Sequence, residues 1–226
     1  MKSLLLGFLL LTATLFGTPY RIIVIPPAEG PSKKNPYNHV AVGPSGPIYQ
    51  QGLSALGQRR ASYLVGYFLG LPGKKPLFPD MVSRNPIKAP IHPITFIGAY
   101  FTEGGAGTFR PVETISPLAN VIFYEQASTT FYQYSPPSVK QFSTQMIKQL
   151  KQNLHLIAHT AVICWKSQDI TSLLTALEPS IEKNESFQKA FPRGKFPKDD
   201  PSNLTFVITY DETLPSFAVY RQEKEP

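Results

Sequence analysis

The side chains that could carry nucleophilic or acid–base chemistry are few in this chain of 226 residues. It has four histidines, at His39, His92, His155 and His159, and a single cysteine, Cys164. Imidazole and thiolate groups are common protein nucleophiles near neutral pH. Cys164 lies within the apolar run 160–165, which is typical of a buried strand, so we expect a packed thiol and not a reactive one.

The positions of the histidines favour structural or surface roles. His155 and His159 stand at the start of a predicted strand, whereas the pockets of open α/β folds lie at the carboxyl ends of strands. These two imidazoles are therefore expected at the edge of the sheet opposite any pocket. His39 and His92 fall in long loops, and they are the histidines that could reach such a pocket.

The turns that follow two predicted strands carry unusual residues. The apolar strand 21–25 leads directly into Pro26-Pro27, and proline offers neither a nucleophile nor a charge nor a backbone N–H donor. The strand 160–165 leads into a turn that contains Ser167 and Asp169. No histidine stands where it would support a serine nucleophile, so we expect Ser167 or Asp169 to cap the next helix.

The pattern of apolar residues predicts which elements position these turns. Short apolar runs indicate strands over 21–25, 94–97, 121–124, 160–165, 204–210 and 216–220. Helical spacing and capping residues indicate helices over 55–69, 111–120, 138–154 and 171–177. Strands that alternate with helices predict a three-layer α/β/α sandwich with a mostly parallel central sheet and an antiparallel edge. The segments 26–52, 70–92 and 179–203 are expected to be loops.

The N-terminal residues resemble a secretory signal peptide over 1–17, with an apolar stretch too short to span a bilayer comfortably. The alternative is an uncleaved N-terminal anchor. Residues 18–226 are then expected to form a single domain. Sequons at Asn184 and Asn203 agree with a secreted glycoprotein, and one cysteine excludes an internal disulfide.

The composition is basic, with a formal charge of +7 and an isoelectric point near 9.4. The lysines are scattered, and no nucleic-acid-binding motif accompanies them, so we interpret them first as a solvated basic surface. Such a surface could also meet an anionic polysaccharide, a phospholipid or a phosphorylated ligand. We expect no metal, cofactor or nucleic-acid partner, and the sequence does not indicate an oligomeric state.

Four segments carry motif residues in a fixed order along the chain. They are the strand and turn 24–31, Gly-Leu-Ser-Ala-Leu-Gly-Gln-Arg-Arg-Ala at 52–61, Thr-Phe-Arg-Pro-Val-Glu-Thr at 108–114, and Val-Ile-Cys-Trp-Lys-Ser-Gln-Asp-Ile at 162–170. Together they resemble the histidine phosphatase (phosphoglycerate mutase-like) superfamily. The resemblance implies the fold of that superfamily. It also implies that the pocket lies where the turns of the first and fourth segments meet.

The same resemblance implies that the phosphohistidine chemistry is lost. Pro26 and Pro27 stand where the superfamily has an arginine and its nucleophilic histidine, and Ser167 stands in place of the second histidine. Arg110 is kept, and Lys166 lies beside the Ser167 position. The resemblance therefore implies a pseudoenzyme with no catalytic residue at these positions.

Our candidate ligand-binding residues are Arg110, Lys166 and Glu29. Arg110 leads this set because a guanidinium fork pairs well with phosphate oxygens. Arg110 could instead form a structural pair with Glu113 or Glu29. Two further hypotheses stay open. One is a secreted phosphomonoesterase that uses a displaced histidine, and the other is an extracellular interaction protein that binds through its proline-rich loops.

Overall fold

The computed structural model describes residues 20–31, 52–70, 75–82, 93–100, 109–125, 130–134, 139–152, 159–197, 203–210 and 215–222. The predicted signal peptide, both long proline-rich loops for most of their length, and His39, His92 and His155 lie outside these ranges. Within them, no helix has the length and apolar character needed to cross a membrane.

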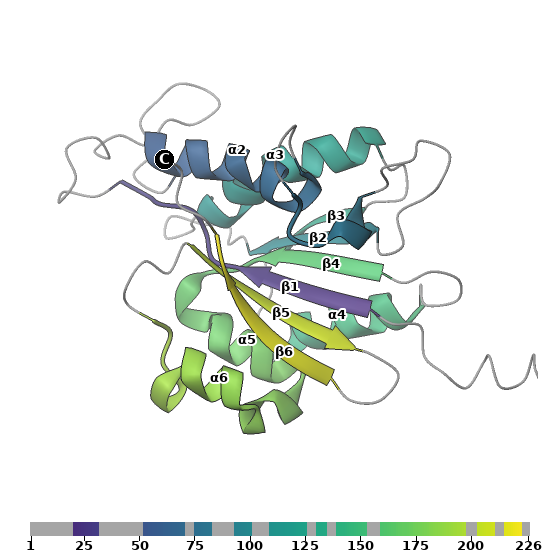
Figure 1. The fold of residues 1–226 in the computed structure, drawn as a ribbon, viewed down its shortest axis with the longest axis vertical. Helices are drawn as coiled ribbons and strands as arrows, with labels where there is room; N and C mark the ends of the chain where they lie inside the picture. The colour runs from purple at the N-terminus through teal and green to yellow at the C-terminus, as the bar shows by residue number, and fades with distance from the viewer. Residues whose placement is uncertain are drawn as a thin grey trace, which may run out of the picture.

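A six-stranded sheet with the order β3-β2-β4-β1-β5-β6 forms the centre of the fold (Figure 1). Four of its strands are parallel: β1 (Tyr20–Ile25), β2 (Ile94–Tyr100), β3 (Thr130–Tyr134) and β4 (His159–Cys164). β5 (Leu204–Tyr210) is antiparallel to β1, and β6 (Pro215–Arg221) is antiparallel to β5. The predicted parallel sheet with an antiparallel hairpin at its edge is thus confirmed.

Helices cover both faces of this sheet, as Figure 1 shows, and complete the predicted α/β/α sandwich. Side chains alternate along β1, so that Ile23 and Ile25 face one layer while Ile22 and Val24 face the other. The first layer contains α2 (Ala55–Leu69) and α3 (Arg110–Glu125). The second contains α4 (Val139–Gln152), α5 (Ile170–Leu177) and α6 (Glu185–Ala190).

The predicted strand 121–124 is wrong, because these residues form the last turns of α3. Ile115, Leu118 and Ile122 are fully buried and follow helical spacing, so one continuous face packs on the sheet. Pro117 lies within the helix without ending it. The third strand along the chain, β3, comes later, at Thr130–Tyr134.

Smaller differences concern the ends and faces of elements. β2 continues to Tyr100 and so is three residues longer than predicted. The segment 179–203, expected to be a loop, contains α6 and the 3-10 turns Pro179–Lys183 and Pro192–Gly194. Leu56 of α2 is 40% exposed, whereas the buried positions of this helix are Gly57, Ala61, Leu64, Gly66 and Phe68.

The start of α2 agrees with the sequence prediction and shows why a glycine follows. The Ser54 hydroxyl caps the helix by accepting a hydrogen bond from the Gly57 amide, at 3.1 Å. A Cβ on Gly57 would lie well inside van der Waals contact with the Glu29 carbonyl oxygen. The first turn of α2 therefore packs directly on the backbone of the loop that follows β1.

We predict that Gly57→Ala lowers the free energy of unfolding by about 1–3 kcal/mol, because backbone must move to admit the methyl group. Denaturant unfolding monitored by circular dichroism measures this change. Ser62→Ala, at an exposed site on the same helix, is the control and should change stability by less than about 0.5 kcal/mol. Equal stability of Gly57→Ala and the control would contradict the close contact.

Cys164 is fully buried in β4, as expected, and burial raises the pKa of its thiol. We predict that the native protein reacts with a disulfide reagent such as Ellman's reagent roughly 100-fold or more slowly than the protein unfolded in guanidinium chloride. The absorbance of the released thiolate follows the reaction. Comparable rates in both conditions would show that the thiol is accessible in the native state.

Candidate functional site

The carboxyl ends of the parallel strands bring two turns together at one edge of the sheet. Ile25 at the end of β1 pairs in register with Cys164 at the end of β4, and Cys164 pairs on its other side with Ala99 of β2. The Trp165 amide then donates a hydrogen bond to the Ile25 carbonyl, at 3.0 Å. The Pro26-Pro27 turn and the Lys166 turn therefore leave the sheet from adjacent positions.

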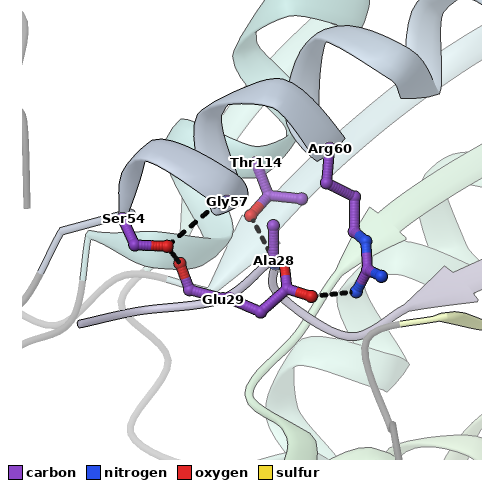
Figure 2. A network of polar contacts seen from close by, with 6 residues as sticks. All are labelled: Ala28, Glu29, Ser54, Gly57, Arg60 and Thr114. Atoms are coloured by element: carbon purple, nitrogen blue, oxygen red, sulfur yellow. Dashed lines mark hydrogen bonds and ion pairs between the residues drawn. The ribbon is translucent and has the colours of Figure 1, made fainter. Parts of the chain in front are cut away.

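Two hydroxyl groups hold the loop that follows β1 against the helices (Figure 2). The Ser54 hydroxyl and the Ser54 amide both donate to the Glu29 carbonyl, at 3.0 and 2.9 Å. The Thr114 hydroxyl accepts from the Ala28 amide at 2.9 Å and donates to the Arg110 carbonyl at 2.6 Å. Both hydroxyl-bearing side chains are buried. The loop is thus attached by its backbone to the starts of α2 and α3.

Two carboxylates strengthen this attachment. Glu29 forms an ion pair with Arg60, one turn further along α2 (Figure 2). Glu113 accepts a hydrogen bond from the Leu53 amide at 2.7 Å, which links α3 to the residue before the α2 cap. Desolvation by burial raises the pKa of Glu113, and the Leu53 amide partly opposes that shift. These contacts give Glu29 and Glu113 structural partners.

Arg110 begins α3 and lies against the loop at Gly30. A Cβ added to Gly30 would stand 2.9 Å from Cδ of Arg110 and 3.0 Å from its Nη1. Any larger residue at this position would require the Arg110 side chain to shift. The side chain is half-buried, so the loop and the helix start limit its freedom while part of it meets solvent.

Lys166 lies in the adjacent turn and contacts two side chains. Its ammonium group is 2.6 Å from Oδ2 of Asp169 and 3.3 Å from the hydroxyl of Tyr100, and it sits 4.6 Å from the centre of the Tyr100 ring. Burial alone would lower the pKa of Lys166, but Asp169 and Tyr100 outweigh burial and raise it. The lysine therefore carries its positive charge at this edge.

Asp169 occupies the expected cap position at the start of α5, but it makes no side-chain capping bond. Ser167 begins a short 3-10 turn, Ser167–Asp169, and does not cap α5. The Asp169 carboxylate pairs with Lys166 instead.

The structure places the other candidate residues as follows. His159 begins β4, at the amino edge of the sheet, as predicted. Asn184 caps α6, its side-chain oxygen accepting from the Ser186 and Phe187 amides. Asn203 is only 4% exposed, so a glycan there would require local opening. Among the residues that the structure describes, no three histidine, cysteine or acidic side chains converge as a metal site would require.

Sequence reasoning missed two residues of this edge, Arg60 and Tyr100. Arg60 was seen only as part of a motif, and its partner Glu29 lies 31 residues earlier in the chain, so no local signal joined the two. Tyr100 lay beyond the predicted end of β2, so its position next to the end of β4 was not anticipated. Its ring also packs edge-on against Trp165, with ring centres 5.0 Å apart.

The raised pKa of Glu113 predicts a pH dependence of stability. A carboxyl whose pKa is higher in the folded state binds its proton more tightly there, so its contribution to stability falls as pH rises from the unfolded value, 4.5, through the folded value. The difference in unfolding free energy between the native chain and Glu113→Gln should therefore decrease over that window. Denaturant titrations at a series of pH values measure it, and an opposite slope would contradict the assignment.

Comparisons with known proteins give a fold likeness without a family. No family model matches the sequence, and no curated protein sequence matches it. The fold is similar to a putative phosphohistidine phosphatase SixA from Agrobacterium tumefaciens, with a TM-score of 0.45 and 9% identity over 90% of this chain and 98% of that chain. A putative SixA from Nakamurella multipartitia has a TM-score of 0.42 and 8% identity over 86% of each chain. At this level of similarity the likeness assigns no activity to the chain.

Proposed function

We propose that this protein is a secreted, catalytically silent relative of the histidine phosphatases that binds an anionic or phosphorylated ligand at the carboxyl edge of its parallel strands. The observation that carries the proposal is the turn after β1. Prolines occupy its first two positions, and Arg110 approaches its backbone at Gly30. The edge thus combines a guanidinium group with a turn that has no nucleophile at those positions.

The loss of catalysis follows from the side chains at this edge. Covalent phosphoryl transfer needs a nucleophile such as an imidazole, and Pro26 and Pro27 cannot serve. Ser167 stands in the adjacent turn without a histidine beside it among the described residues, whose single histidine, His159, lies at the opposite edge. A serine with no base to take its proton is a weak nucleophile.

Two positively charged side chains, Arg110 and Lys166, support the proposed binding of an anion, and they differ in their surroundings. Arg110 is positioned by the start of α3 and lies close to Gly30 at the proposed site. Lys166 pairs with Asp169, and an incoming dianion would compete with that carboxylate. Arg110 is the principal contact in this proposal because its planar guanidinium group can pair with two phosphate oxygens at once, and Lys166 adds charge nearby.

Glu29 takes a different role here from the one the sequence suggested. Its carboxylate pairs with Arg60 and its carbonyl accepts from Ser54, so we assign it to positioning the loop and not to contacting the ligand. Secretion and glycosylation at Asn184 or Asn203 stay predictions. So do the phosphomonoesterase and loop-interaction hypotheses, because His39, His92 and most of the two proline-rich loops lie outside the described residues.

Calorimetric titration with phenyl phosphate tests the proposal. We expect binding by the native chain and roughly 10- to 100-fold weaker binding by Arg110→Gln, the range that a charge-assisted hydrogen-bonded pair supplies. Arg59→Gln removes the same charge from an exposed site on α2 and should leave the affinity within about twofold.

The same preparations should not hydrolyse p-nitrophenyl phosphate above the rate of buffer. Turnover that is present in the native chain and lost in Arg110→Gln would overturn catalytic silence. Equal affinity of Arg110→Gln and Arg59→Gln for phenyl phosphate would overturn the binding site.

A further inference from the structure

A second feature lies on the sheet face covered by α5 and α6, away from Arg110, which belongs to α3 on the other face. It is a cavity of about 740 Å³ between α6, the turn that follows it, and the paired strands β5 and β6. This volume lies within the range of small-molecule sites, roughly 300–1,000 Å³. None of the candidate residues Arg110, Lys166 or Glu29 lines it.

The described lining of this cavity carries positive charge. Lys189 comes from the last turn of α6, Lys195 from the segment after the 3-10 turn, and Arg221 from the end of β6. All three side chains are exposed, and no acidic residue belongs to the lining that the structure describes. Three cations from three separate segments around one concavity favour an anionic occupant.

The base of the cavity is apolar. Leu204 at the start of β5 is buried, and Val219 and Phe196 are partly buried. Val219 and Arg221 are two residues apart in β6 and therefore lie on the same face of the strand. The apolar side chain of Val219 and the guanidinium group of Arg221 are thus neighbours. The Phe196 ring packs near Phe206, with ring centres 5.9 Å apart. A ligand seated here would meet charge at the rim and hydrocarbon beneath.

Local backbone contacts hold these walls in place. The Gly194 amide donates to the Phe191 carbonyl at 2.9 Å, and the Lys195 amide donates to the Pro192 carbonyl at 3.2 Å. Arg193 adopts a left-handed conformation, with φ of 57°, which turns the chain sharply between them. At the opposite wall, the Gln222 amide donates to the Asn203 carbonyl at 2.8 Å. Walls held in this way reduce the ordering cost of binding.

We propose that this cavity binds a small amphipathic anion, a single carboxylate, sulfate or phosphate group carried on an apolar body. Lys189, Lys195 and Arg221 contact the anionic group, and Leu204, Val219 and Phe196 contact the apolar body. The site differs from the proposed phosphate contact at Arg110, because the two share no residue and Arg110 belongs to α3 in the other helix layer.

Calorimetric titration with octanoate tests this proposal, with octan-1-ol and acetate as partial ligands. Octanol has the apolar body without the charge, and acetate has the charge without the body. We expect one octanoate per chain, bound roughly tenfold or more tightly than either partial ligand, and an affinity that falls as sodium chloride is raised.

The variant Lys189→Gln with Arg221→Gln should weaken octanoate binding roughly tenfold while leaving octanol binding within about twofold. Lys183→Gln with Arg59→Gln removes the same charge from exposed sites outside the cavity and should bind octanoate like the native chain. Absence of octanoate binding, equal binding of octanol and octanoate, or equal loss in both double variants would overturn the proposal.

Discussion

Two hydroxyl groups hold the backbone of the loop after β1 in place by hydrogen bonding. The arrangement of residues at the carboxyl edge of the parallel strands depends on the position of that loop. Ser54 and Thr114 reach it from α2 and α3 and satisfy the Glu29 carbonyl and the Ala28 amide. Buried backbone groups without such partners would cost free energy on the order of 1–3 kcal/mol each. Without these bonds, Gly30 would not be held where Arg110 can lie against it. The two hydroxyl groups therefore hold the loop at this edge of the sheet.

Residues of the motif segment 52–61 therefore act here as structural contacts. Three of them contact Glu29. The Ser54 hydroxyl donates to its carbonyl, Gly57 packs against its backbone, and Arg60 pairs with its carboxylate. These interactions do not need a histidine in the preceding turn, and two prolines are compatible with them.

Much of the fold could be predicted because its signals are local. The apolar run of β1, the Ser54 cap of α2 and the pairing of β5 with β6 each depend on neighbouring residues. The end of α3 could not be predicted in this way, since Val121 to Tyr124 is apolar and aromatic and suits a strand equally well. Packing of Ile115, Leu118 and Ile122 on the sheet decides for the helix.

The site was predicted less completely because its contacts join distant residues. Arg110 and Lys166 were recognised by type and by their motifs, but the partners Asp169 and Tyr100 of Lys166 depend on how the turn and β2 end. Glu29 was assigned to a ligand because nothing in the sequence connects it to Arg60, which is 31 residues away. The cavity beside α6 was not anticipated, since its segment read as a loop without helices.

Native-state hydrogen exchange at the Ala28 amide tests the central claim most directly. Its partner, the Thr114 hydroxyl, is buried, so the amide should exchange only through a large opening of the structure. We predict exchange as slow as that of Val24 in β1, and faster exchange at Ala28 than at Val24 in Thr114→Val. An Ala28 amide that exchanges in the native chain at the rate of an unstructured peptide would contradict the account.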